Sequence, residues 1–354
     1  MRGLVVKSTG SSYHVSLSSG DVIECVVKGN FRIRGIRSTN PVAVGDYVQV
    51  EHQPDGTNWI TDIEDRKNYI IRRSTNLSKQ SHILAANLDL VALVVTLRHP
   101  TTSLTFIDRF LATAEAYRVP ACLVFNKTDL LTDDEQQELR EVRDIYERIG
   151  YTTVALSALD KQSVLTAMLP LLHGKVTLFS GNSGVGKSTL LNVLLGEDRA
   201  RTGSISSAHD KGMHTTTFSE MYQIRVKGEE MKRLITQLPD APILNAQIVN
   251  GQIVNAPILN AQIVNAQIVN AQIVNIIDTP GIKGFGSLDM QREEISHYFK
   301  DIFAVSRHCR FGNCTHTGEP GCAVVRAVEE GSIAASRFNS YLSMLGDAEE
   351  GKYR

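Results

Sequence analysis

The sequence predicts a multidomain chain: a small N-terminal β-barrel, a central α/β domain with a doubly wound parallel sheet, and a C-terminal helical and loop segment that binds a metal. Three observations predict it. Short strand-like runs separated by glycines fill the first 73 residues, strand-like and helical runs then alternate, and three of the five cysteines crowd between Cys309 and Cys322. We expect the domains to be 1–73, 74–298 and 299–354.

The N-terminal part has strand-like runs at 3–8, 13–17, 22–27 and 47–50. About 70 residues and five strands fit an OB-like barrel. Its cations have Phe31 and Trp59 nearby as stacking partners, and they are Lys28, Arg32, Arg34, Arg37, Arg66, Lys67, Arg72 and Arg73. Acids are interleaved, so a solvated barrel surface is one interpretation. Cations with aromatics on such a barrel favour RNA binding.

Composition excludes some classes of protein. The net charge of -1 and the pI near 6.8 give no global attraction to nucleic acid, so local patches must carry any such role. The chain lacks an uncharged apolar run of about 18 residues, the length of a membrane span. Few cysteines, most of them clustered, indicate a reduced protein. We therefore expect a cytoplasmic location and no membrane.

A phosphate-binding loop follows the apolar run 176–179 and precedes the apolar run 190–195. A strand, a glycine-rich turn and a helix in this order place backbone N–H groups around phosphates. Lys187 is predicted to reach the outer phosphates and Ser188 to ligate Mg²⁺. The nucleotide-binding residues predicted here are Gly181, Asn182, Ser183, Gly184, Val185, Gly186, Lys187, Ser188 and Thr189.

A base-reading loop lies upstream, after the apolar strand 121–125. Asp129 can accept hydrogen bonds from the N1 and N2 donors of guanine, which adenine lacks, and a site built to pair them rejects other bases. Asn126 is expected to serve the other edge of the base, and the Lys127 stem to cover its face. After the strand 152–156, Ser157 and Ala158 are expected to place backbone N–H groups near the guanine O6.

The order of these motifs is unusual, because the base-reading half precedes the phosphate loop. The sheet can be the same as in ordinary guanine-nucleotide switches if only the opening of the chain has moved, since domain termini lie at the surface. The chain after the second switch then leaves the domain and enters the cysteine segment. We expect loss of the γ-phosphate to reorient that segment.

Two switch segments are predicted. In the first, one of three threonines at 215–217 is expected to meet Mg²⁺ and the γ-phosphate, and Thr216 is the candidate. In the second, Asp278 is expected to hold Mg²⁺ through water, and the Gly281 N–H to sense the γ-phosphate. Ile282 follows Gly281, where many switches keep a water-orienting glutamine.

An isoleucine cannot hold water, so we expect slow intrinsic turnover. His214 is the candidate for orienting the attacking water, and the alternative is that it only packs or caps within its loop. Lys187 is expected to stabilise charge during the reaction.

Between the switches, residues 241–275 are seven five-residue units such as Ala-Gln-Ile-Val-Asn. An odd period flips the faces of a strand at each repeat. The block is interpreted either as a fragment of a β-solenoid or, as we favour, as an inserted excursion at the tip of a hairpin without a role in the chemistry.

Near the C-terminus, Cys309, Cys314, His316 and Cys322 have the residue types of a closed, structural zinc site. The alternative is three buried cysteines beside a surface histidine. Cations that could contact a phosphate backbone surround the quartet, and they are Lys300, Arg307, His308, Arg310 and Arg326.

Together the motifs resemble one family, the circularly permuted GTPases of the RsgA (YjeQ/EngC) type, which depend on the small ribosomal subunit. The resemblance rests on residues 41–46, 126–129, 181–189, 214–217, 278–286 and the Cys/His quartet. It implies a cytoplasmic bacterial GTPase that hydrolyses GTP to GDP and phosphate, binds the 30S subunit and 16S rRNA late in assembly, and is stimulated by the ribosome. One Zn²⁺, Mg²⁺ with GTP, and a monomer are expected. The repeat block departs from the family pattern, in which the hairpin between the switches is short.

Two alternatives remain open from the residues. One is a binding module that uses GTP as a timer for a protein partner. The other is a zinc-dependent nucleic-acid-binding protein in which GTP is only structural.

Overall fold

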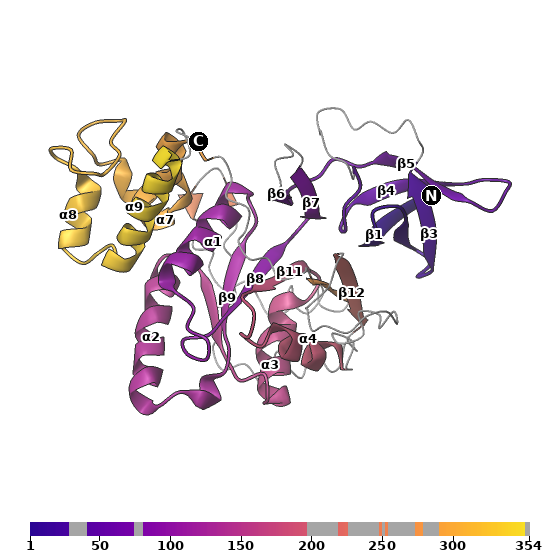
Figure 1. Cartoon of the computed structure of the whole chain (residues 1–354), viewed down its shortest axis with the longest axis horizontal. Helices are drawn as coiled ribbons and strands as arrows, with labels where there is room; N and C mark the ends of the chain where they lie inside the picture. Colours follow the sequence, from indigo (N-terminus) through magenta and orange to yellow (C-terminus); the bar gives the residue numbers. More distant parts are fainter. Residues whose placement is uncertain are drawn as a thin grey trace.

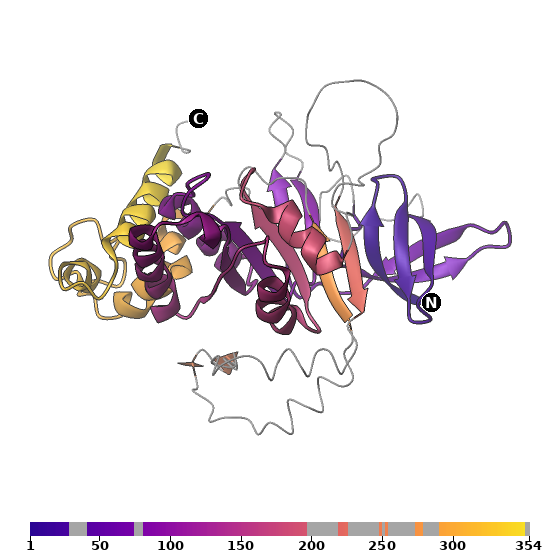
Figure 2. The ribbon, with the colours of Figure 1, turned by 90° about the horizontal axis from the view of Figure 1, so that it is seen from below.

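The computed structural model describes residues 1–27, 41–73, 81–196, 219–225, 248–249, 252–253, 273–278 and 290–350. The barrel and the C-terminal helices lie at opposite ends of the central α/β domain, as both views show (Figures 1 and 2). None of the described helices is both long and apolar enough to cross a bilayer.

The N-terminal unit is a closed five-stranded barrel with β3 parallel to β5 and the other pairs antiparallel. The strand order is β1-β2-β3-β5-β4 and back to β1, which confirms the predicted OB-like barrel. Alternate side chains such as Val5, Val15 and Ile60 fill its interior. The strands are β1 Arg2–Ser8, β2 Tyr13–Leu17, β3 Val22–Val27, β4 Tyr47–His52 and β5 Asn58–Ile63.

A hairpin that the sequence pattern did not predict joins barrel and central domain. Strand β6 (Tyr69–Arg73) pairs antiparallel with β7 (Ser81–Ala86), so the two strands bracket the predicted boundary at residue 73. Residues 74–80, between the two strands, lie outside the described residues. Ile70 and Ala85 are fully buried and pack into the core of the central domain. These short strands lack a clear alternation of apolar and polar residues. Their burial against the central domain stabilises the hairpin instead.

The central sheet has the order β10-β9-β8-β11-β15-β12, and its strands are parallel except β12 at the barrel side. This confirms the doubly wound architecture and the displaced opening of the chain, because β8 enters beside the phosphate-loop strand β11. The strands are β8 Leu90–Val95, β9 Ala121–Phe125, β10 Thr152–Ala155, β11 Val176–Gly181, β12 Glu220–Arg225 and β15 Ile273–Asp278.

Helices cover both faces of this sheet. Along β8, Val91, Leu93 and Val95 face one core, whereas Ala92 and Val94 face the other. Helices α1 (Leu104–Ala116) and α2 (Asp133–Arg148) close the first core, and α3 (Lys161–Leu172) and α4 (Lys187–Leu195) close the second. Such burial on both faces explains the continuous apolar runs in these strands.

The end of the repeat block belongs to the sheet, which corrects the predicted bounds of the insertion. Ile273, Val274 and Asn275 are repeat residues, yet they form the first half of β15. Strand β15 pairs antiparallel with β12, so the chain between them does connect the arms of a hairpin. Of the earlier units only β13 (Ile248–Val249) and β14 (Gln252–Ile253) are described, and they pair with each other.

The central sheet continues into the barrel through β12 and β1, which pair antiparallel at Lys7 and Glu220. The Lys7 ammonium lies 3.2 Å from the Glu220 carboxylate, and the Ser16 hydroxyl is 3.3 Å from Gln223 Oε1. Strand β12 therefore links the barrel to the hairpin that joins the two switch segments.

Arg66, predicted as part of a basic surface, is buried instead. Its guanidinium donates to both oxygens of Asp46 at 2.6 Å and to the Pro41 carbonyl at 2.7 Å. The side chains of Arg66 and Asp46 are 7% and 0% exposed, so this cation cannot contact RNA. Lys67 pairs with Asp89. The predicted cations from Lys28 to Arg37, with Phe31, lie outside the described residues.

The C-terminal unit is helical. Its last helix, α9, packs against α1 of the central domain. Ile295, Phe299 and Tyr341 form the core of this unit, so its packing begins before the predicted boundary at residue 299. Its elements are the 3-10 helix η3 Arg292–Tyr298 and the helices α7 Lys300–Ser306, α8 Ala323–Glu329 and α9 Ala335–Glu350.

A buried ion cluster fixes this unit to the central domain. The Arg337 guanidinium on α9 donates to Asp108 of α1 and to Asp301 of α7, each at 2.7 Å, and is 1% exposed. The Tyr146 hydroxyl also donates to Asp108 at 3.0 Å. Burial raises the pKa of Asp108, which Arg337 opposes. A rotation of this unit with nucleotide state would have to separate Arg337 from Asp108.

Replacing Arg337 with methionine should lower stability strongly. The change leaves two buried carboxylates without their cation, which typically costs about 3–5 kcal/mol. Urea unfolding followed by circular dichroism should show a lower midpoint. Arg326→Met is the matched control, because that side chain is 67% exposed and should shift the midpoint little. An equal effect of the two changes would contradict the role assigned to the cluster.

Candidate nucleotide site and metal centre

Four parallel strands end at one edge of the sheet, and their following residues carry most of the predicted nucleotide motifs. Strands β9, β10, β11 and β15 lead to Asn126, Leu156, Asn182 and Asp278 respectively. The carboxyl ends of parallel strands are where open α/β sheets bind ligands. The two halves that are inverted in sequence therefore meet in space.

Asn126 joins three loops at this edge. Its Nδ2 donates to the Val185 carbonyl in the phosphate loop at 2.8 Å, and its Oδ1 accepts from the Ala158 N–H at 2.8 Å. The side chain is buried. Each end of the amide thus has one protein partner, while the second N–H and the second lone pair of the oxygen stay available for the expected contact with the base edge. The amide also engages the Ala158 N–H that was expected near the guanine O6.

The phosphate loop needs glycine at two positions where its backbone lies very close to neighbouring atoms. Gly186, the residue before α4, has φ +88°, and a Cβ there would lie 2.3 Å from Asn126 Nδ2. At Gly181 a Cβ would lie 2.5 Å from the Val94 carbonyl oxygen. Positive φ and short distances both exclude larger residues at these points. Val185 is buried between them and anchors the loop in the core.

Lys187 and Asp278 lie side by side. The Lys187 ammonium contacts the Asp278 carboxylate, and the two side chains are 14% and 11% exposed. Asp278 reaches this position because β15 pairs with β11, which places it opposite Phe179. Ser188 and Thr189 are exposed in the first turn of α4, at the N-terminus of this helix. A cation, a carboxylate and a hydroxyl thus gather at one helix N-terminus, the chemistry that holds a phosphate and Mg²⁺.

The base-reading loop leaves its carboxylate accessible. Asp129 is exposed in the 3-10 turn η1 (Thr128–Leu130), three residues after the buried Asn126. Lys127 has a left-handed backbone, and its ammonium donates to the His99 carbonyl at 2.5 Å. The Leu159 N–H bonds to the Ser157 hydroxyl at 3.2 Å.

The turn after β8 contacts both halves of the site and was not predicted. His99 binds Lys127, and the Pro100 ring lies against Gly184. A proline directly after an apolar strand marks a turn, but sequence alone does not show which loops that turn will meet. The predicted residues His214, Thr216 and Gly281, with Ile282, lie outside the described residues.

The four predicted metal ligands come together at the other end of the molecule. The ligand atoms of Cys309, Cys314, His316 and Cys322 all lie within 4.8 Å of one another. His316 Nδ1 is 3.6 Å from Cys309 Sγ and 3.4 Å from Cys322 Sγ, and those sulfurs are 4.0 Å apart. Tetrahedral zinc with ordinary bond lengths needs separations of about 3.5 Å for S to N and about 3.8 Å for S to S.

Burial acts on the protonation of two of these groups, and of the two effects only the neutral imidazole is the form that binds a metal. Burial raises the pKa of the Cys314 thiol to about 12 and lowers the pKa of the His316 imidazole. Both shifts oppose charge on the protein groups themselves, and a divalent ion would reverse the shift for the thiol. His316 is 1% exposed, so the surface histidine of the alternative interpretation is wrong.

Glu319 braces the loop that carries two of the ligands. Its carboxylate accepts from the Thr315 N–H and hydroxyl at 2.6 Å and from the Thr317 N–H at 2.8 Å. Burial would raise its pKa, but these hydrogen bonds prevail and lower it to about 2. The Tyr341 hydroxyl donates to the Thr315 carbonyl at 2.8 Å. The backbone on both sides of His316 is thus fixed by protein contacts.

The cations near the quartet differ in their availability. Lys300 pairs with Glu115 at 2.8 Å and lies 4.1 Å from the Tyr151 ring centroid, so it holds α7 on the central domain. Arg310 lies over the exposed Phe311 ring at 5.4 Å.

Comparison with known proteins gives consistent results. A family model described as RsgA GTPase matches residues 63–229, and one described as RsgA N-terminal domain matches residues 2–60. An ABC transporter model also matches residues 166–298, which include the phosphate loop. Proteins named small ribosomal subunit biogenesis GTPase RsgA from Phocaeicola vulgatus and Bacteroides fragilis are 52% and 53% identical; each alignment covers 100% of this chain and 99% of the relative.

Two solved structures share the whole architecture. YjeQ from Thermotoga maritima has a TM-score of 0.68 and 28% identity, with 98% of each chain covered. YloQ, described as a circularly permuted GTPase, has a TM-score of 0.67 and 25% identity, with 100% of this chain and 96% of the other covered.

Replacing Glu319 with glutamine should weaken metal retention. Glutamine has one acceptor oxygen in place of a carboxylate, so the loop between Cys314 and Thr317 loses charge-assisted hydrogen bonds. Changes behind a ligand shell typically cost about tenfold or more in metal affinity. Zinc release from loaded protein to a chromophoric chelator measures the effect. Glu329→Gln, on the exposed side of α8, is the control, and equal release from the two variants would argue against the brace.

Proposed function

The chain belongs to the RsgA family of GTPases, and from this we propose that it binds GTP where β9, β10, β11 and β15 end and hydrolyses it to GDP and phosphate in the assembly of the small ribosomal subunit. Asn126 carries the proposal for the site. Its bonds to Val185 and Ala158 support a single ligand held by the base-reading and phosphate loops together.

The base is assigned to the loop after β9. Asp129 is exposed at the mouth of the site, where its two carboxylate oxygens can accept from the N1 and N2 donors of guanine. The Lys127 stem, held at its end by the His99 carbonyl, is assigned to the face of the base. Ser157 is assigned to the O6 side, because the Ala158 N–H is already used.

The phosphates are assigned to the turn at 182–186 and to the N-terminus of α4. Lys187 bonds to Asp278, so the phosphates would compete with this carboxylate for the ammonium. With nucleotide bound, the Lys187 ammonium would serve the outer phosphates, and Ser188, together with Asp278 through water, would hold Mg²⁺. Mg²⁺, when bound, neutralises charge on the phosphates. Exchange of one ion-pair partner for another keeps both buried groups compensated.

Hydrolysis is assigned to in-line attack of water on the γ-phosphorus, with the bond to the bridging oxygen breaking and GDP leaving. Lys187 and backbone N–H groups stabilise the charge that develops. His214 remains our candidate for orienting the water, and Thr216 and Gly281 for sensing the γ-phosphate.

The relatives' name supports the small ribosomal subunit as the partner. We propose that the barrel and the metal-bearing unit contact 16S rRNA from the two ends of the molecule, that the chain acts as a monomer in the cytoplasm, and that the metal is a structural zinc. The residue types and distances of the quartet support zinc, because three thiolates and an imidazole leave no ligand position open.

Exchange of Asp129 for asparagine should change the preferred base. An amide keeps one acceptor and gains a donor, which suits the O2 acceptor of xanthine and not the N2 amino group of guanine. GTP affinity should fall by about 100-fold or more, and xanthosine triphosphate should bind better than it does to the unchanged protein. Calorimetry with both nucleotides tests this. Asp133→Asn in the first turn of α2 is the control. Unchanged preference would refute the base assignment.

Purified small subunits should raise GTP turnover, whereas large subunits should not. With small subunits present, His214→Ala should lower turnover while GTP affinity stays the same, because the histidine is assigned to the water and not to the nucleotide. Phosphate release and fluorescent-nucleotide titration measure the two quantities. Absence of stimulation would refute the proposed partner, and unchanged turnover of the variant would refute the role of His214.

A further inference from the structure

The turn that follows β8 is closed by its own hydrogen bonds. The Thr96 hydroxyl donates to the Pro100 carbonyl at 2.5 Å, the Thr102 N–H donates to the Thr96 carbonyl at 2.9 Å, and the Thr96 N–H donates to the Thr102 hydroxyl at 3.2 Å. Both threonines are buried. These hydrogen bonds fix the two ends of the turn, and His99 and Pro100 lie between those ends.

His99 and Pro100 lie next to the two halves of the nucleotide site, the base-reading loop and the phosphate loop. The His99 carbonyl accepts from the Lys127 ammonium in the base-reading loop. Pro100 lies near the phosphate loop, since a Cβ placed on Gly184 would come within 3.5 Å of its Cδ and 3.7 Å of its Cγ. The position of this turn thus decides where the Lys127 side chain ends.

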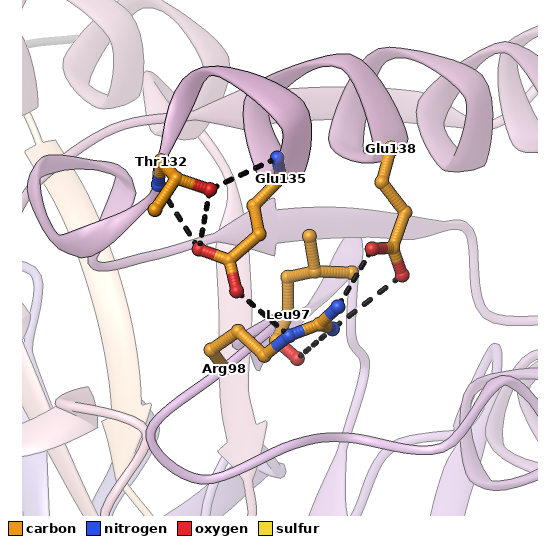
Figure 3. A network of polar contacts seen from close by, with 5 residues as sticks. All are labelled: Leu97, Arg98, Thr132, Glu135 and Glu138. Carbon is orange, nitrogen blue, oxygen red and sulfur yellow. Dashed lines mark hydrogen bonds and ion pairs between the residues drawn. The ribbon is translucent and has the colours of Figure 1, made fainter.

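Arg98, next to these two residues, is clamped to α2 (Figure 3). Its Nε donates to Glu135 at 3.0 Å, its Nη2 donates to Glu138 at 2.7 Å, and its Nη1 donates back to the Leu97 carbonyl at 3.1 Å. A guanidinium that bonds two carboxylates and its own backbone has little freedom left.

One of these carboxylates also starts the helix. Thr132 and Glu135 form a capping box, in which the Thr132 N–H donates to Glu135 at 3.0 Å (Figure 3). The Thr132 N–H, followed by Arg98, lowers the pKa of Glu135. Helix α2 begins four residues after Asp129, so the clamp ties the turn to the end of the base-reading loop.

We propose that Arg98 is a positioning residue for guanine-nucleotide binding: it holds the His99 carbonyl at the point where Lys127 docks, so that the lysine stem lies across the base. The inference rests on the proposed assignment of the base to this loop. Arg98 acts through Lys127 and does not itself touch the nucleotide.

A role confined to stability fits the clamp poorly. Leu139, Val142 and Tyr146 already bury α2 against the sheet. The side chains of Arg98, Glu135 and Glu138 remain 31%, 25% and 46% exposed, and ion pairs at such exposure add little to global stability. The local consequence is larger, because freeing Arg98 releases a turn that holds a ligand-binding lysine.

The test is a double-mutant cycle on the full-length protein with fluorescent GDP as the probe. Arg98→Met should weaken GDP binding about fivefold, mainly through faster dissociation. In the Lys127→Met background the same change should have almost no further effect, because the side chain it positions is absent. Arg98→Lys, which can keep one ion pair, should restore part of the affinity.

Arg148→Met is the matched control, since that arginine pairs with Asp144 on the exposed face at the end of the same helix. Thermal melts should show all variants folded. An equal loss in both backgrounds, or unchanged GDP binding by folded Arg98→Met, would overturn the proposal. If the unchanged protein itself fails to bind GDP, the proposed function fails instead, so the two failures are distinct.

Discussion

A single buried amide determines whether the two inverted halves of the chain can act on one ligand. Asn126 follows β9, yet its side chain bonds to Val185 after β11 and to Ala158 after β10. Inside a protein these bonds cannot be exchanged for water without a cost of about 1–3 kcal/mol for each group left unpaired. The requirement for glycine at position 186 follows from the same contact, because a Cβ there would displace the amide. The base-reading and phosphate loops are therefore fixed relative to one another before any nucleotide arrives, which reduces the ordering cost of binding.

Most of the architecture could be predicted, because its signals are local. Turn glycines and short alternating runs indicated the barrel, and apolar strands before polar motifs indicated the parallel sheet. Contacts between distant residues could not be predicted. The burial of Arg66 depends on Asp46 across the barrel, and the β6–β7 hairpin depends on packing of Ile70 and Ala85 against another domain. The bonds of Asn126 to Val185 and Ala158 could not be predicted either, because these partners lie 59 and 32 residues away in the sequence. The metal quartet was predictable because its residues lie close in sequence and share one chemistry.

The two ends of the molecule are attached to the central domain in different ways. The metal-bearing unit is held by a buried arginine between two aspartates, which resists rotation because separation would leave charges uncompensated. The barrel is joined by the continuation of the sheet from β12 into β1 and by a partly exposed ion pair. Strand β12 lies between the two switch segments in sequence, and it pairs with β1 of the barrel. The direction of coupling expected from sequence was towards the cysteine segment.

Strand β15 begins inside the repeat block, and this has a consequence for how the length of the block can vary. Ile273 to Asn275 are the same residues that several earlier units contain, so they cannot by themselves define the register of the strand. The unique Ile276, Ile277 and Asp278 must do so. Because the ends of the intervening chain are held by antiparallel pairing of β12 with β15, gaining or losing one unit changes the closure entropy by only about 0.1 kcal/mol. Copy number is thus nearly neutral for folding. A lineage could drift in tandem-repeat length while the Asp278 carboxylate stays in place at the end of β15.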